Sequence, residues 1–465
     1  MDGLHRNSLG ILRLVWQGWG MTAPAADVAY LFTGIALLAL GATPLSILIG
    51  FLIYLTILNT SYRFSKKYIS AGSDFTYVGK SLGGFMATFE GWNLLFGTAF
   101  AYAGFGMLGL TAFFGLFYPT LLSTYLWIPL VIAINLITFF LLYKGIRFST
   151  NYQIITGFAE FVVLIAGGIG LVILAGKNNT LAVFNPFLAA GGIPGFLHSL
   201  ILSVVTYIGL SIALTAISEE SKIPKRNIPK SLIISSVLIG ATFVFLSYAM
   251  TVAWGPLNML SYGKSNDPGL ILFYRVSPVL FGLLFILTIN SFMGNNIAMG
   301  TSMTRIFYAF SRDNVIFPKS FSKINKKNGT PYISTVFILI LSVILGIIFG
   351  ISFGPEDGGF VLLFADAFFS FLIRSITSSS LIISTYKNKK IGITALLGNL
   401  VIPLISIAVL LTVLASNFFP LPVYPYNYAS ILGIVIIIAS LFVTVYTYYK
   451  NPETIGNAGK TTLED

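Results

Sequence analysis

The chain is 465 residues long, and 56% of these are hydrophobic while only 9% are charged. Soluble proteins average roughly half apolar and about a quarter charged residues, so the mean hydropathy of +0.88 indicates an integral membrane protein with many spans. The chain has no Cys and two His, His5 and His198, which excludes disulfides, thiolate chemistry and a histidine-rich metal centre. We therefore expect no metal and no cofactor.

Apolar runs of about 20 residues, the length that crosses a bilayer, recur along the whole chain. The sequence predicts twelve spans, near residues 11–40, 44–62, 84–108, 125–143, 152–175, 197–218, 231–254, 279–304, 331–350, 359–385, 392–416 and 427–449. The polar start of the chain is short and the first apolar run is a full span, so we expect no cleavable signal peptide.

The net charge of +12 would suit a nucleic acid or anionic lipid, but the positions of the charges indicate topology instead. Nearly all Lys and Arg fall in alternate loops; the other side has only Lys177, Lys264 and Arg275, and Arg374 lies inside a span. Because cytoplasmic loops are rich in Lys and Arg, the pattern predicts a multi-pass protein of the cell membrane with both termini in the cytoplasm. The even number of spans predicts the same, and we expect no nucleic-acid partner.

Glycine interrupts two of the predicted spans, one in each half of the chain. Residues 18–24 (GWGMTAP) interrupt the first span, and residues 207–211 (YIGLS) interrupt the sixth. Backbone groups freed inside a membrane are tolerated only against protein or a water-filled cavity, and matching breaks in two halves are typical of a transporter's binding site. Gly and Pro in spans can also serve packing alone, but two breaks at matching positions favour a functional role.

The span order predicts an all-α polytopic protein built from repeats. Spans one to five and six to ten each begin with a broken helix, which indicates two five-helix repeats of inverted orientation. The predicted units are a first repeat (1–176), a second repeat (177–390), helices eleven and twelve (391–450) and a polar cytoplasmic tail (451–465) that we expect to be disordered.

The two breaks offer complementary groups to a zwitterion. Gly18 and Gly20 let the backbone leave helical geometry, and Pro24 suits the first turn of a restarted helix. The restarted helix presents free amides and a positive dipole end, which favour a carboxylate. Carbonyls freed around Ile208 and Gly209 offer acceptors for an ammonium group. The pattern therefore indicates an amino acid as ligand.

Three segments resemble signatures of the amino acid–polyamine–organocation (APC) superfamily. Residues 218–229, SEESKIPKRNIP, are similar to its EE-x-K-x-P-x-R-x-I-P signature at the cytoplasmic end of span six. Residues 305–331 contain RDN, FP and GTP and resemble the R-D-G…P…G-T-P loop after span eight. Residues 70–78, SAGSDFTYV, resemble the S-A-G-G-x-Y-x-Y-V segment after span two.

This resemblance implies a LeuT-like fold and alternating-access transport of amino acids or amines. Carried over residue by residue, the family's substrate contacts fall on Gly18, Trp19, Gly20, Met21, Thr22, Tyr207, Ile208 and Gly209. The chain departs from the family where Ala23-Pro24-Ala25 follows the first break and where Ser211 replaces an acidic residue that many relatives have. The missing acid argues against a polyamine, which needs carboxylates to pair with its ammonium groups.

Ionisable groups inside spans are costly and functional by default. Some proton-coupled APC relatives have Lys where this chain has Glu160, so the resemblance implies that Glu160 binds a cation or carries the coupled proton. Asn295 in span eight is a second coupling candidate, although both residues could simply bridge helices. Asp366 and Arg374 in span ten are gating candidates, but they are too far apart on one helix for direct contact.

Taken as a whole, the sequence predicts a secondary active transporter that moves amino acids, with proton symport favoured over sodium coupling. An exchanger of amino acids or amines, a polyamine permease and a non-transporting amino-acid receptor remain alternatives. An intramembrane enzyme would need a nucleophile, a metal cluster or paired carboxylates, and the sequence offers none of them. The particular substrate, the direction of flux and the oligomeric state stay open.

Overall fold

The computed structural model describes residues 3–386, 392–416, 418 and 421–464. Within these residues the chain is helical, with two isolated β-bridges, Leu9 with Ser221 and Ile324 with Pro331, and no longer strand. Ten of the described helical segments are long and apolar enough to cross a membrane. The protein is therefore an all-helical, multi-pass membrane protein.

The helices of the first part of the chain are α1 (Ile11–Met21), α2 (Pro24–Ala26), α3 (Phe32–Ala39), α4 (Thr43–Ser65), α5 (Asp74–Leu82), α6 (Gly84–Phe117), α7 (Pro119–Leu122), α8 (Trp127–Tyr143) and α9 (Ile146–Ala175). A π-helical turn, Asp27–Leu31, joins α2 to α3. The middle part holds α10 (Ile193–Ile208), α11 (Leu210–Thr215), α12 (Pro224–Trp254), α13 (Met259–Gly263), α14 (Pro268–Val276), α15 (Pro278–Arg312), α16 (Tyr332–Phe353) and α17 (Pro355–Tyr386). The last helices are α18 (Ile393–Leu396), α19 (Ile402–Ser416), α20 (Asn427–Lys450) and α21 (Pro452–Asn457).

The ten candidate spans differ from the twelve that the sequence predicts, for two reasons. The run Ile11–Ser65 is one helical segment of 55 residues, although a single crossing needs only about 20. Helix α8 is apolar but has 17 residues, slightly fewer than a full crossing. The count of twelve stays a prediction.

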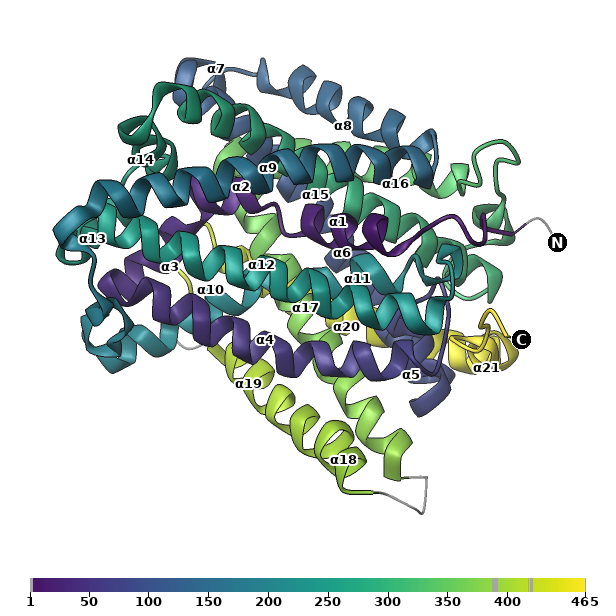
Figure 1. The fold of residues 1–465 in the computed structure, drawn as a ribbon. Coiled ribbons are helices and arrows are strands. Elements are labelled where there is room, and N and C mark those ends of the chain that lie inside the picture. The colour runs from purple at the N-terminus through teal and green to yellow at the C-terminus, as the bar shows by residue number, and fades with distance from the viewer. Residues whose placement is uncertain (1–2, 387–391, 417, 419–420, 465) are drawn as a thin grey trace.

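Two large apolar cores hold the bundle together. One lies chiefly between α6, α8, α15, α16 and α17, and the other between α1, α4, α9 and α12. Figure 1 shows both termini at the same end of the bundle, with α5 and α21 also at that end. The interrupted helix α1 packs against α15 and α11, so it lies between the two cores.

The tail after Lys450 is folded, which corrects the expectation that it is disordered. It forms α21, and its Ile455 and Ala458 side chains are only 3% and 0% exposed. The physical reason is a close backbone approach: a Cβ added to Gly79 of α5 would lie 2.6 Å from the Cα of Gly459. Small residues on both sides therefore let the tail lie directly on α5.

Candidate functional site

The first helix break lies at Thr22 and Ala23. Helix α1 stays regular as far as Met21, Ala23 adopts a left-handed conformation with φ of 43° and ψ of 58°, and α2 begins at Pro24. A left-handed Ala is unfavourable in isolation, so the surrounding contacts must hold it. Pro24 occupies the first turn of the restarted helix, as the sequence predicts.

The glycines before the break serve close packing, which corrects the prediction that they open the backbone. Gly18 and Gly20 are both helical residues of α1. A Cβ on Gly18 would lie 2.8 Å from the hydroxyl oxygen of Ser235, and one on Gly20 would lie 2.1 Å from Oε1 of Gln153. Their lack of side chains lets α12 and α9 approach α1.

Glu160 of α9 caps the restarted helix. Its Oε1 accepts a hydrogen bond from the backbone amide of Ala25 at 3.2 Å, and its Oε2 accepts one from the indole Nε1 of Trp19 at 2.6 Å. The side chain is 2% exposed. An anion at a helix N-terminus is stabilised by the free amides and the dipole. In this structure the amide end that we expected to face a substrate carboxylate therefore faces a protein carboxylate.

Asn295 of α15 contacts the other side of the same break. Its Nδ2 donates to the backbone carbonyl of Met21 at 2.5 Å. One residue earlier, the carbonyl of Gly294 accepts a hydrogen bond from Nε2 of Gln153 at 2.7 Å, which ties α15 to α9. The two predicted coupling residues, Glu160 and Asn295, thus both bind backbone groups at the first break.

The second interruption is smaller than the sequence suggests. Gly209 separates α10 from α11, but its φ of −70° and ψ of −24° remain in the right-handed helical region. Its lack of a side chain matters more than its conformation, because a Cβ there would lie 2.9 Å from Cε of Met21. The two interrupted helices therefore touch at Met21 and Gly209.

Tyr207 and Ile208 pack into the scaffold behind Gly209. The Tyr207 ring stacks on Tyr54 of α4 with ring centroids 5.6 Å apart, and Ile208 belongs to an apolar cluster that includes Phe371 of α17. Both side chains are buried, at 0% and 3% exposure. These contacts position the second interruption, and Gly209 is half-buried and lines a cavity.

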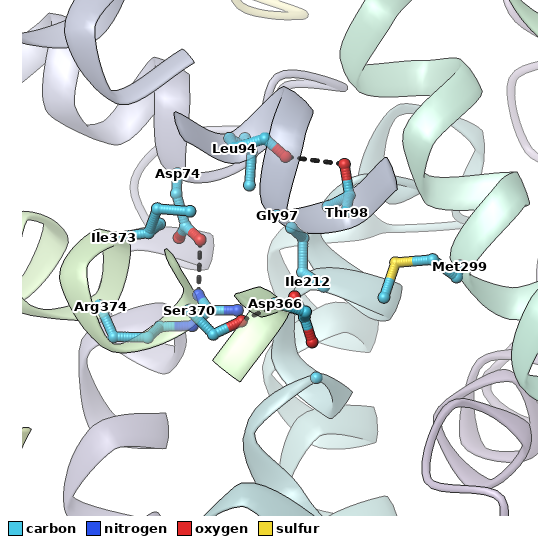
Figure 2. Close-up of a pocket in the computed structure, with 11 residues that line it drawn as sticks. Asp74, Leu94, Gly97, Thr98, Ile212, Met299, Asp366, Ser370, Ile373 and Arg374 are labelled. Carbon is cyan, nitrogen blue, oxygen red and sulfur yellow. Dashed lines mark hydrogen bonds and ion pairs between the residues drawn. The ribbon is translucent and has the colours of Figure 1, made fainter. Parts of the chain in front are cut away.

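A small cavity lies next to Gly209 (Figure 2). It is lined by Asp74, Leu94, Gly97, Thr98, Gly209, Ile212, Met299, Asp366, Ser370, Ile373 and Arg374. Its volume of about 30 Å³ holds a group of roughly the size of water. These lining residues come from α5, α6, α11, α15 and α17, together with Gly209, so the cavity joins segments that are far apart in the sequence.

The gating candidates Asp366 and Arg374 both line this cavity, but each has a different partner. Nη1 of Arg374 donates to Oδ2 of Asp74 at 2.5 Å, and Oδ1 of Asp366 accepts from its own helix neighbour Ser370 at 3.3 Å. Figure 2 shows the contact between Asp74 and Arg374 beside Ser370 and Asp366. Burial raises the pKa of Asp74, and the Arg374 guanidinium partly offsets this.

Sequence reasoning missed Asp74 as a member of the site. Asp74 stands in the segment 70–78 that carries one of the family resemblances, yet it lies outside every predicted span and was not assigned a role. The available signal was an acid in a short helix after span two together with an Arg left inside span ten. Because 300 residues separate Asp74 from Arg374 in the chain, the sequence does not reveal that they pair.

A second set of ion pairs lies at the end of the bundle that carries both termini. Arg305 of α15 holds both carboxylate oxygens of Glu220, at 2.9 and 3.0 Å, and Arg312 holds Glu219 at 3.0 Å. The Glu220 carbonyl accepts the amides of Ser8 and Leu9. Burial raises the pKa of Glu220, while the Arg305 charge opposes that shift. Glu219 and Glu220 therefore both pair with basic side chains of α15.

Comparison with known proteins identifies relatives of this chain. It is 27% identical over 296 residues to the low-affinity putrescine importer PlaP of Escherichia coli (61% of this chain, 63% of the importer). It is 26% identical over 299 residues to the branched-chain amino acid permease BcaP of Bacillus subtilis (60% and 62%). A third relative is the probable agmatine/putrescine antiporter AguD of Lactococcus lactis, 29% identical over 201 residues (39% and 40%). The matched part of the chain spans less than two thirds of each of these relatives.

A family model supplies broader coverage than any of these pairwise matches. The model described as "Amino acid permease" matches residues 16–445. That range includes both interrupted helices, Glu160, the cavity and all ten candidate spans except a few terminal residues. The match confirms the resemblance stated from the three sequence segments and places the chain among transporters rather than enzymes. The chain belongs to the amino acid permease family, within the amino acid–polyamine–organocation superfamily.

Proposed function

We propose that this protein is a secondary active transporter that moves amino acids or amines across the cell membrane by alternating access. The observation that carries the proposal is the contact between Met21 and Gly209, where two interrupted helices meet beside a small cavity that charged side chains help to line. Interrupted spans are tolerated only against protein or a cavity and mark binding sites in transporters. The substrates that the names of the relatives give, putrescine and branched-chain amino acids, support the substrate class.

The proposed arrangement is LeuT-like, with twelve spans. Two inverted repeats occupy residues 1–176 and 177–390, helices eleven and twelve occupy 391–450, and 451–465 forms the cytoplasmic tail. The segment Ile11–Ser65 is long enough for two crossings, and α8 supplies a further one. An even number of crossings agrees with the position of both termini at one end of the bundle (Figure 1). The concentration of Lys and Arg in the loops assigned to that end favours a cytoplasmic location for both termini.

Substrate contacts in this proposal centre on the meeting point of the two interruptions. Met21, Thr22 and Gly209 would touch the substrate directly. Trp19 and Tyr207 would position those residues without touching the substrate, because both side chains are fully buried. Trp19 donates a hydrogen bond to Glu160, and the Tyr207 ring stacks on Tyr54. Gly18, Gly20 and Ile208 would contribute through packing.

We assign coupling to a proton carried by Glu160, with sodium as the alternative ion. A charged carboxylate holds the amide of Ala25 and the indole of Trp19 more strongly than a neutral carboxyl group would, because charge-assisted hydrogen bonds are roughly twice as strong as neutral ones. Protonation of Glu160 would therefore loosen the restarted helix. Asn295 would keep its hold on the Met21 carbonyl in either state.

Purified protein in liposomes tests this proposal directly. The uptake of radiolabelled leucine, alanine, lysine and putrescine is measured in sodium-free buffer with an inward proton gradient. We expect uphill accumulation of at least one of them, and its collapse when a protonophore is added. Equilibration without accumulation would retain transport but reject proton coupling, and counterflow from preloaded vesicles would then identify an exchanger. Binding without uptake would indicate a receptor, and neither binding nor uptake of any member would contradict the proposal.

A further inference from the structure

The cavity beside Gly209 is lined by two carboxyl groups, Asp74 and Asp366, and by one basic side chain, Arg374. Arg374 is the one basic side chain that lines it, and its charge is matched by Asp74 at 2.5 Å. Asp366 lines the same cavity, and the hydrogen bond it receives there comes from the neutral hydroxyl of Ser370. A carboxylate in a low-dielectric interior is costly unless it is paired or neutralised. Among the described residues that line the cavity, Asp366 therefore has no cationic partner.

A second observation points to a missing donor at the same place. The Oδ1 atom of Asp74 is fully buried and has no hydrogen-bond partner among the described residues, although its Oδ2 atom binds Arg374. Buried polar atoms are nearly always hydrogen-bonded. Asp74 of α5 and Asp366 of α17 both line the cavity, which has room for one small group (Figure 2).

We propose that this cavity binds the distal ammonium group of a diamine or a basic amino acid, with Asp366 as its counter-ion. The inference rests on the proposed transport function and specifies its substrate class. A primary ammonium has about the size of water and three donors, which suits a volume of about 30 Å³. A planar guanidinium with its five donors needs more space.

The rest of the lining suits a methylene chain that ends in such a group. Ile212 and Met299 line the cavity with apolar side chains, and Thr98 and Ser370 line it with hydroxyl groups. Amphipathic groups of this kind bury their apolar stem and direct the charged end toward polar partners. A bare inorganic cation would gain nothing from Ile212 or Met299.

Asp366 also supplies a carboxyl group that span six lacks. Span six has Ser211 where many relatives have an acid, which argued against a polyamine. Asp366 of α17 supplies a carboxylate to a cavity that Gly209 itself lines. Because Gly209 touches Met21, a substrate held at the helix interruptions could reach Asp366 with its far end.

Matched ligand pairs on the wild-type protein provide the first test. Lysine is compared with norleucine, and putrescine with 1-aminobutane, by competition against a bound labelled substrate. Each pair differs in the distal ammonium group. We expect lysine and putrescine to bind at least about tenfold more tightly than their partners, as charged hydrogen bonds of this kind imply. Equal binding within both pairs would overturn the inference while leaving the transport proposal intact, whereas binding of none of the four would count against transport itself.

Variants provide the second test. Asp366→Asn keeps the shape of the side chain but removes the charge, and we expect the lysine-to-norleucine preference to fall about tenfold. Asp357→Asn is the control, because Asp357 lies on the same helix, accepts a hydrogen bond from Tyr426 at 2.9 Å and does not line the cavity. An unchanged preference in Asp366→Asn would reject the inference. A different result would reassign the cavity to an inorganic cation. In that case the wild type shows no preference for lysine, sodium raises its melting temperature, and Asp366→Asn abolishes this stabilisation.

Discussion

The carboxylate of Glu160 binds Trp19 before the first helix break and Ala25 after it, so one side chain of α9 bridges the interruption. The two distances are 2.6 and 3.2 Å. A change in the charge of this carboxylate acts on both halves of the broken helix at once. Asn295 holds the carbonyl of Met21 between them, so protein side chains bind backbone groups on both sides of the break.

Glu160→Gln tests whether that bridge carries the coupling. The amide retains the size of the side chain but cannot titrate, so we expect proton-driven accumulation to be abolished while exchange of labelled for unlabelled substrate continues. Both activities are measured in the same liposome preparation. Glu453→Gln serves as the control, because Glu453 is exposed on α21. Unchanged accumulation in Glu160→Gln would reject Glu160 as the proton carrier.

Gly209→Ala tests the contact between the two interruptions. The backbone at Gly209 is helical, and Ala is favoured over Gly in a helix by about 1 kcal/mol, so we expect the thermal stability to be retained. The new methyl group would lie 2.9 Å from Cε of Met21 and displace that side chain. We expect KM for uptake to rise about tenfold, as small misplacements in binding sites do.

Gly282→Ala is the matched control for this variant. Gly282 is also helical, in α15, and a Cβ there would meet nothing within 4 Å. The control should leave KM unchanged. A Gly209→Ala protein with wild-type KM would show that the contact with Met21 does not shape the substrate site.

The sequence located the first break within a few residues, and it singled out Glu160 and Asn295, which both contact that break, for one physical reason. Polar groups inside a membrane must find partners, so freed backbone groups and intramembrane side chains are expected to meet. What could not be predicted is which residue leaves the helix. Local propensity favours glycine, yet packing against Ser235 and Gln153 keeps Gly18 and Gly20 helical, and Ala23 takes the left-handed conformation.

Contacts between residues that are distant in the chain could not be predicted from the sequence either. The sequence placed Arg374 inside a span and Asp74 outside any span, and only the packing of α5 against α17 brings them together. The folded tail was missed because its composition is polar. Its order depends on the glycines Gly79 and Gly459, which permit a backbone approach that composition does not reveal.

The stability of the protein should fall between about pH 4 and pH 6 because of Asp267, which lies between α13 and α14. Burial and the nearby charge of Glu356 raise the pKa of Asp267 to about 6. A carboxyl group whose pKa is higher in the folded state favours folding while it is protonated and loses that contribution as the pH rises through the folded value. Asp267→Asn cannot ionise, so we expect it to remove this dependence and to stabilise the protein at pH 7 by up to about 3 kcal/mol.

Apparent melting temperatures in detergent between pH 4 and pH 8 measure the effect. Asn also tolerates the left-handed backbone at this position, where φ is 48°. Glu356→Gln is the matched comparison, since it removes the neighbouring charge and leaves the burial, and it should reproduce part of the gain. Parallel profiles for Asp267→Asn and the wild type would contradict the assignment.

Gly79→Ala should detach the folded tail from α5. The added Cβ would lie 2.6 Å from Cα of Gly459 and 2.7 Å from the carbonyl oxygen of Ala458, and backbone atoms cannot move aside as a flexible side chain can. Overpacking of this kind costs about 1–3 kcal/mol. We expect trypsin to cleave after Lys460 about tenfold faster or more, because cleavage follows the population of the open form.

The wild-type tail is also held directly after that bond. The amide of Leu463 donates to the carbonyl of Ile69 at 2.8 Å, and the carbonyl of Thr461 accepts from Arg312 at 3.2 Å. Gly456→Ala is the control, because a Cβ at Gly456 of α21 would meet nothing within 4 Å. If Gly79→Ala and Gly456→Ala are cleaved at the wild-type rate, the close contact with α5 does not hold the tail. Faster cleavage in Gly79→Ala alone would show that a single methyl group on α5 controls whether the tail covers this end of the bundle.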